Sequence, residues 1–261
     1  MYYANGKEVL ALQHQGSDKV RVWSGPEVIT WLLKSCGQSG RLLFRAGARL
    51  VLCEPEGLER TLYQGDFFTL DASLLARKAV VWQKGELILV DWGQGTTDVL
   101  ISDAPTDFTI SPDGEKIAFG ENWLRIFSKG QFKTLSTASE ASKPSFSPDN
   151  QCVAFLNGDY ELWTVNVDGS ELTKLAWVAD TTVSVAERRS SYAFKPAWSS
   201  DGRFLVAQLT HATASPERSD AQIEHASVIV DLQEGRAEIW PGYHSLSIFR
   251  PTVEARWAGT R

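Results

Sequence analysis

With 261 residues, the chain is long enough for one large β domain or two small domains. Its formal net charge is −6 and it has no basic stripe, which argues against a phosphate-binding surface and so against nucleic acid. The first residues lack the regions of a signal peptide, and no apolar run could span a bilayer. Three widely spaced cysteines favour free thiols over disulfides or a zinc site. We therefore expect a cytoplasmic protein.

The first hundred residues predict short strands and no helix with a sustained 3.6-residue period. Residues 69–78 allow one helical turn at most. The turn Asn5-Gly6 matches a later strand-connecting turn, so we expect the chain to begin between the first and second strands of a repeated unit. No outer strand is found between Trp23 and Val28. The predicted strands are 7–13, 19–23, 28–33, 40–44, 49–53, 58–63, 66–70, 79–82, 86–91 and 97–101.

One pattern then occurs three times, each time as a strand, a turn of the type Ser-(Pro/Ser)-Asp-(Gly/Asn), and a second strand. The copies begin at Phe108, Pro144 and Pro196, and the first two continue into third and fourth strands. Asp113 and Asp149 in the first two turns are 36 residues apart, and Asp201 follows 52 residues later. A repeat near 40 residues with short strands is typical of propeller blades.

We therefore predict an all-β fold, a single β-propeller over residues 1–261 with six four-stranded blades. Residues 252–257 have the spacing of an innermost strand and are predicted to pair with the N-terminal blade, which would close the ring and remove open sheet edges. Five or seven blades remain alternatives.

The turn aspartates are interpreted as structural, because Asp in such turns bonds its own backbone while Pro and Gly set the dihedral angles. The larger second spacing reveals an insertion at 177–192, between blades. A second insertion, 210–225, separates the second and third strands of the last blade. Loops this long are either functional or disordered. Both are expected on the face opposite the turns.

The candidate binding residues come from these insertions and from the starts of third strands on the same face. Four of them are of metal-ligand type, but no two histidines share a close-spaced motif, so neither a metal site nor a cofactor is predicted. No catalytic residue is assigned. The candidate binding residues are Trp123, Asp159, Tyr160, Arg188, Arg189, Tyr192, His211, Arg218, Asp220, Glu224 and His225.

The three repeats resemble the TolB-like, or PD40, propeller family, a relative of WD40 repeats. The resemblance covers about residues 105–207, including Asn166-Val-Asp-Gly-Ser170 after a third strand. It implies a propeller whose relatives mostly bind proteins or accompany serine peptidases. The sequence shows neither the signal sequence and extra N-terminal domain of the periplasmic members nor a hydrolase domain, so we expect neither a periplasmic role nor peptidase activity.

Two functions follow as hypotheses. The first is a non-catalytic propeller that binds a protein partner on the loop-rich face, as a monomeric bacterial accessory protein or a toxin-neutralising immunity protein. Its acidic charge would steer a basic partner. The alternative is a small-molecule hydrolase of the lactonase or glycosidase type that acts from the central channel. That enzyme would need polar side chains at inner-strand ends, and the positions to inspect are Asp103, Asp107, Glu121, Asn157 and Asp159.

Overall fold

The structure is a computed structural model that describes residues 2–5, 8–12, 19–24, 29–35, 41–54, 57–136, 140–158, 161–176, 195–213 and 222–241. These residues form strands and turns, and the described ranges contain no helix long and apolar enough to cross a membrane. The chain divides into two compact units, Met1–Thr106 and Asp107–Arg261.

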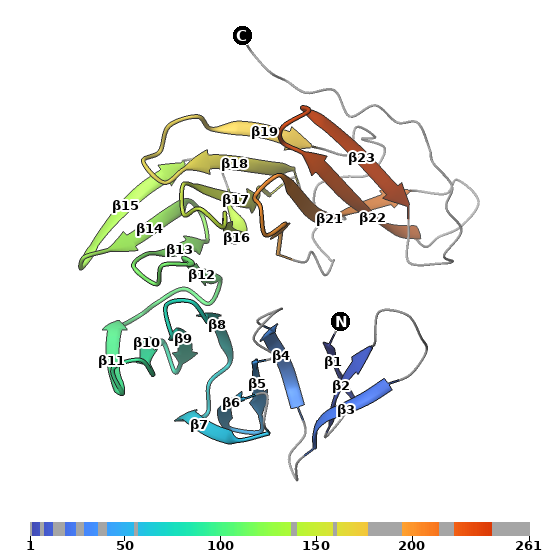
Figure 1. The fold of residues 1–261 in the computed structure, drawn as a ribbon. Helices are drawn as coiled ribbons and strands as arrows, with labels where there is room; N and C mark the ends of the chain where they lie inside the picture. The colour runs from blue at the N-terminus through green and yellow to red at the C-terminus, as the bar shows by residue number, and fades with distance from the viewer. Residues whose placement is uncertain are drawn as a thin grey trace. The chain divides into compact units, whose positions relative to one another are not determined.

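The first unit consists of three antiparallel sheets in its described residues, with the strands of each sheet in chain order (Figure 1). The first sheet has three strands and the other two have four. The strands are β1 (Tyr2–Asn5), β2 (Glu8–Leu12), β3 (Lys19–Ser24), β4 (Ile29–Ser35), β5 (Leu42–Ala46), β6 (Arg49–Cys53), β7 (Glu59–Gln64), β8 (Thr69–Ser73), β9 (Lys78–Gln83), β10 (Glu86–Asp91) and β11 (Thr96–Ile101).

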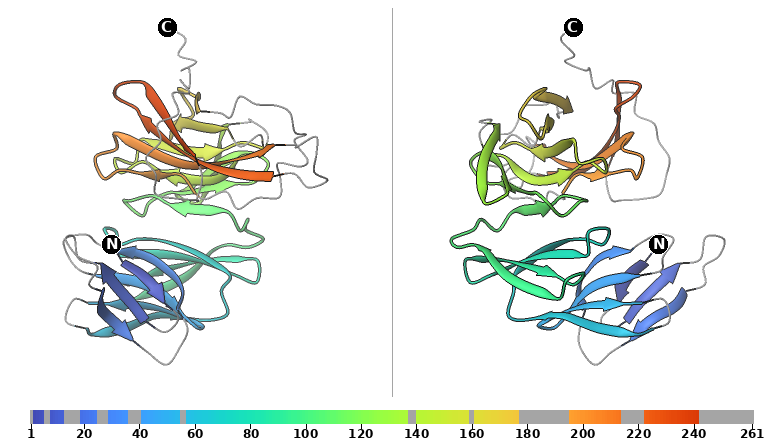
Figure 2. Two further views of the ribbon diagram at one scale, coloured as in Figure 1. Left: turned by 90° about the vertical axis from the view of Figure 1, so that its right-hand side faces the viewer. Right: turned by 60° about the vertical axis from the view of Figure 1, so that its left-hand side comes forward.

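The second unit contributes three further four-stranded antiparallel sheets, again in chain order (Figures 1 and 2). The described strands are β12 (Phe108–Ile110), β13 (Ile117–Gly120), β14 (Leu124–Ser128), β15 (Gln131–Ser136), β16 (Ser142–Phe146), β17 (Cys152–Leu156), β18 (Leu162–Asn166), β19 (Thr173–Ala176), β20 (Ala197–Trp198), β21 (Phe204–Thr213), β22 (Gln222–Asp231) and β23 (Arg236–Pro241). The prediction of an all-β propeller built from four-stranded sheets is confirmed.

The first strand of each sheet is its inner strand. In the second unit β16 lies against β12 and β13 of the sheet before it and against β20 of the sheet after it. In the first unit β4 lies against β1 and β8. The expectation that the chain begins at a turn is therefore wrong, because Tyr2–Asn5 already forms the inner strand β1, paired with β2. The predicted closing strand at 252–257 lies outside the described residues.

The hydrophobic core lies between neighbouring sheets within each unit. Leu43, Leu50 and Leu52 of one sheet pack with Ala79, Val81 and Val90 of the next. In the second unit, one such layer joins Leu124 and Ile126 to Val153 and Phe155, and another joins Leu156 and Leu162 to Leu205 and Val228. In these layers the sheets bury their apolar side chains against one another, which explains why inner and middle strands read as continuous apolar runs.

Two predicted elements differ from the structure. The inner strand predicted at 66–70 is β8, Thr69–Ser73, and the single turn allowed within 69–78 is confined to residues 74–77, between β8 and β9. Phe67 misled the prediction: it is buried without belonging to the strand, with its ring 5.8 Å from that of Tyr63 and 4.6 Å from the Arg45 guanidinium carbon.

The insertion at 210–225 differs from the prediction as well. Its two ends extend the sheet, because β21 and β22 continue pairing as far as Thr213 opposite Gln222. Figure 2 shows this long hairpin in orange and red. Residues 210–213 and 222–225, which the sequence predicted to lie in a loop, are therefore regular strand. The prediction failed because this stretch is polar, and polar residues can also continue a hairpin.

Candidate functional site

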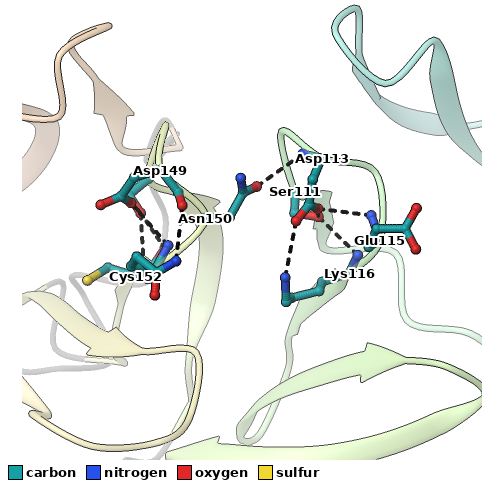
Figure 3. Close-up of polar contacts among 9 residues, drawn as sticks. Ser111, Asp113, Glu115, Lys116, Asp149, Asn150 and Cys152 are labelled. Atoms are coloured by element: carbon teal, nitrogen blue, oxygen red, sulfur yellow. Dashed lines mark hydrogen bonds and ion pairs between the residues drawn. The ribbon is translucent and has the colours of Figure 1, made fainter.

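The repeated turns are built from one hydrogen-bond pattern (Figure 3). In the first copy, Ser111 Oγ donates to Asp113 Oδ1 at 2.5 Å and accepts the Lys116 backbone N–H at 2.9 Å. Asp113 Oδ1 also accepts the Glu115 N–H at 3.0 Å. Ser147 and Asp149 repeat these bonds in the second copy, and Ser199 and Asp201 repeat them in the third.

These bonds stabilise the charged form of each aspartate. Burial acts against ionisation of Asp113, but the bonds from Ser111, the Glu115 amide and Lys116 lower its pKa overall. The Ser147 hydroxyl and the Gln151 amide lower the pKa of Asp149, and equivalent bonds lower that of Asp201. The carboxylates are thus occupied by their own turns. Their interpretation as structural residues is confirmed, although the part played by serine was missed.

Neighbouring turns also touch. The backbone N–H of Asp113 donates to Asn150 Oδ1 at 3.1 Å, which links the turn of one sheet to the turn of the next (Figure 3). The first two turns therefore both close their own hairpins and link neighbouring sheets. Within the described ranges, no group of three or more His, Cys, Asp or Glu side chains could hold a metal ion.

The opposite ends of the inner strands carry a different arrangement. Asp107, Lys143 and Lys195 each stand immediately before the repeated motif, so they occupy the same position in three successive sheets. The Lys143 backbone N–H donates to Asp107 Oδ2 at 2.7 Å. The Lys195 ammonium donates to the Phe108 carbonyl at 2.6 Å, 87 residues away in the chain. The Asp107 carboxylate, the Lys143 backbone and the Lys195 ammonium thus lie at one end of β12, β16 and β20, and we call these three residues the inner-end cluster.

The connection that carries Lys143 into the cluster has a constrained backbone. Glu140 and Lys143 have φ values of 58° and 55°, a conformation uncommon for residues with a side chain. Backbone bonds support it, because the Glu140 N–H donates to the Asn122 carbonyl at 2.9 Å. Such residues are most frequent at functional sites, where the surrounding structure holds the strain.

Two glycines make room for this connection. A Cβ on Gly120 would lie 2.8 Å from Ser142 Cα and 3.0 Å from the Ala141 carbonyl oxygen. A Cβ on Gly158 would instead meet the Glu140 side chain, with its carboxylate oxygen as the nearest atom. The absence of a side chain at both positions therefore lets the connection cross close to the ends of the second strands.

A second polar network lies at the start of β18. Glu161 accepts bonds from Asn157 Nδ2 at 2.9 Å, Trp163 Nε1 at 3.0 Å and Lys174 Nζ at 3.0 Å. The Lys174 ammonium also lies 5.7 Å from the Trp163 ring. These bonds hold β17, β18 and β19 together. They also occupy the Glu161 carboxylate, which is therefore not available for chemistry.

The structure places only part of the predicted site. Trp123 is 53% exposed just before β14. His211, Glu224 and His225 belong to the extended hairpin, where His211 pairs with Glu224 and His225 with Thr210 in the backbone register. The remaining predicted site residues lie outside the described ranges: Asp159, Tyr160, Arg188, Arg189, Tyr192, Arg218 and Asp220.

Among the positions proposed for the alternative function, Asp107 is the one that joins the inner-end cluster. Asn157 belongs to the Glu161 network, and Glu121 is 3.4 Å from Arg125 in an exposed ion pair. Asp103 is an exposed turn residue with φ of 54°. Lys143 and Lys195 were missed. Their signal was available in the sequence, because both directly precede a copy of the repeat.

Comparison with solved structures shows the fold class. An oligogalacturonate lyase in complex with manganese aligns with 91% of this chain and 74% of its own, with a TM-score of 0.59 and 15% identity. The oligogalacturonate lyase of Vibrio parahaemolyticus aligns with 90% of this chain and 73% of its own, at TM-score 0.59 and 15% identity. A chain of the mitotic checkpoint complex aligns with 93% of this chain and 86% of its own, with a TM-score of 0.56 and 12% identity. No family model and no curated protein match.

These comparisons define a β-propeller and change the functional expectation. The first two similar structures are enzymes whose fold is a propeller. This likeness runs against the hypothesis of a non-catalytic protein-binding propeller and favours the enzyme alternative. The sequence led to the first hypothesis because its repeats specify the fold and carry no catalytic signature, and one fold hosts many functions.

We predict that Ser111→Ala destabilises the protein by about 2 kcal/mol, since the completely buried hydroxyl satisfies both a carboxylate and a backbone amide. Urea unfolding measures the change. Ser200→Ala is the matched control, because exposed Ser200 stands where the other copies have proline, and its effect should stay within about 0.5 kcal/mol. Equal losses in the two variants would contradict the pattern.

The turn carboxylates also predict a pH dependence. Because the folded pKa of Asp149 is lowered, its contribution to stability is complete above the unfolded value of about 3.9 and disappears as pH falls through the folded value. Asp149→Asn should therefore be less stable than wild type at neutral pH, and the difference should shrink towards about pH 3. Urea unfolding across this range tests it. A constant difference would show that the carboxylate charge contributes nothing.

Gly120→Ala is predicted to destabilise the protein by about 3 kcal/mol, because the new methyl group meets backbone atoms that cannot move without shifting the connection. Gly158→Ala should cost less, since the Glu140 side chain can rotate away. Thermal and urea unfolding of both variants provide the comparison. If Gly158→Ala were the more damaging change, the connection would not be the constraint that the structure indicates.

Proposed function

We propose that this protein is a small-molecule enzyme that acts on an anionic saccharide at the inner-end cluster. The observation that carries this proposal is the placement of Asp107 with Lys143 and Lys195 at one end of three neighbouring inner strands. One carboxylate and two lysines at neighbouring strand ends are suited to a negatively charged substrate, because the lysines can bind its charge while the carboxylate accepts a proton.

Asp107 has the role of general base. Its Oδ2 atom is fixed by the Lys143 amide at 2.7 Å, which orients the carboxylate. A carboxylate has about four acceptor positions, so this one bond leaves capacity for a substrate proton. Removal of a proton beside a substrate carboxylate creates further negative charge, and nearby ammonium groups stabilise that charge.

The two lysines differ in how they are held. Lys195 is half-buried, and its ammonium is bonded to the Phe108 carbonyl at 2.6 Å, beside Asp107. Lys143 is positioned through its backbone, by the bond to Asp107 and by the left-handed conformation of the residue. Lys143 is accordingly the better candidate for direct substrate binding, and Lys195 for fixing the cluster.

The structural likeness to oligogalacturonate lyase supports an acidic saccharide as the substrate class. Hydrolysis, as in a lactonase or glycosidase, is the second candidate reaction. A glycosidase normally uses two carboxylates on either side of the scissile bond, whereas elimination requires one base. The cluster contains one aspartate and two lysines, which favours elimination.

The repeats are proposed to be of the TolB-like type, supported by three turns with the same hydrogen bonds.

Incubation with short oligogalacturonates tests the proposal directly. Elimination should yield an unsaturated, ultraviolet-absorbing product, while hydrolysis should yield only new reducing ends. Asp107→Asn should lower kcat at least about a hundredfold because the base is lost. The fold should persist, since the amide oxygen can still accept the Lys143 N–H. Lys143→Gln should raise KM about tenfold.

The controls are matched in chemistry and backbone. Asp98→Asn changes an exposed aspartate of β11 and should leave kcat and KM unchanged. Lys84→Gln changes an exposed lysine with φ of 51°, close to the 55° of Lys143, so both glutamines experience the same backbone conformation. An active enzyme that tolerates Asp107→Asn would overturn the assigned base, and no product from acidic saccharides would overturn the substrate class.

A further inference from the structure

We propose that a pocket in the first unit binds a small organic anion, independently of the inner-end cluster. The pocket has a volume of about 200 Å³ and opens between the sheet β4–β7 and the sheet β8–β11. Three arginines and two glutamates line it, together with leucines and one tryptophan. Pockets for drug-sized ligands begin near about 300 Å³, so this volume fits a smaller molecule.

The charges of the pocket favour an anion. Its three arginines are Arg41, Arg60 and Arg77. Arg41 is neutralised by Glu54, with Nε and Oε2 2.7 Å apart. Glu59 is the only other carboxylate among the lining residues, which leaves the lining with a net charge of +1. Guanidinium groups recognise carboxylate and phosphate through paired hydrogen bonds, so the shared chemistry is that of an oxyanion.

The two remaining arginines are anchored from opposite sheets. Arg60 on β7 stands opposite Leu52 of β6 in the strand register, and Leu52 itself lines the pocket. Arg77 lies in the turn between β8 and β9, where its carbonyl accepts the Trp92 N–H at 3.0 Å. A Cβ on Gly93, in the turn between β10 and β11, would be only 3.5 Å from Arg77 Cδ. The stem of the Arg77 side chain therefore lies against the β10–β11 turn. The backbone thus fixes where both side chains begin.

The remaining lining favours a ligand with an apolar part. Trp92 is only 9% exposed and belongs to the core layer between the two sheets, as does Leu74. Both residues line the pocket beside the arginines. An inorganic anion would use the guanidinium groups alone, whereas an organic anion could also cover apolar surface. The inferred ligand is therefore a small carboxylate or phosphate monoester whose body contacts this surface.

Calorimetric titration with phenyl phosphate, benzoate and inorganic phosphate tests this inference on the full chain. Phenyl phosphate or benzoate should bind more tightly than inorganic phosphate, and the stronger of the two identifies the oxyanion. Arg60→Gln and Arg77→Gln should each weaken that binding about tenfold, and more together, because each removes a charge-assisted hydrogen bond. Binding should also weaken with added salt.

Arg236→Gln is the matched control, because Arg236 is an exposed arginine of the second unit that does not line the pocket. It should leave the affinity unchanged. Absence of binding at millimolar ligand, or binding that survives both Arg60→Gln and Arg77→Gln, would overturn the site. Inorganic phosphate binding as tightly as both phenyl phosphate and benzoate would overturn the assignment of an organic ligand. Neither result depends on saccharide turnover, so this site and the proposed activity can fail separately.

Discussion

The fold depends on one constraint: no sheet in this protein can bury its apolar side chains alone. A four-stranded sheet of about twenty residues has two apolar faces and too little chain to cover them, so stability comes from its neighbours. The core layers follow this rule, since each joins residues of two adjacent sheets. The spacing between sheets is therefore as important as the pairing of strands within them.

The repeated turns meet this constraint with polar groups. Serine and aspartate satisfy the backbone of the hairpin locally, and Asn150 extends the same network to the neighbouring turn. Trp198 adds a second link, because its Nε1 atom donates to the Ser145 carbonyl at 3.1 Å across two sheets. At the other ends of the inner strands, the Lys143 amide and the Lys195 ammonium make the equivalent links. The residues proposed for chemistry are thus also bonded into the frame, which favours precise positioning.

Much of this arrangement could be predicted from the sequence, because it is local and repeated. The pattern from Phe108 to Phe119 encodes a strand, a turn and a strand within a dozen residues, and its recurrence fixes the blade. Prediction failed where side-chain burial does not follow strand periodicity, as at Phe67, and where polar residues continue a hairpin, as at Thr213. The candidate site was only partly predictable, since Asp107, Lys143 and Lys195 are brought together by contacts between sheets that no local pattern encodes.

The charge of the whole chain conceals what its surfaces can bind. The net charge of −6 argues against nucleic acid, which requires a long basic stripe. It says little about a small ligand, because exposed charges farther apart than about 8 Å are largely screened at physiological ionic strength. A ligand in a pocket responds to the few groups that line it. Two lysines beside one aspartate, or three arginines beside two glutamates, are each locally positive on an acidic protein. The net negative charge of the protein does not help small anions to approach. Selective binding of such anions therefore depends on the short-range, directional bonds inside each basic recess.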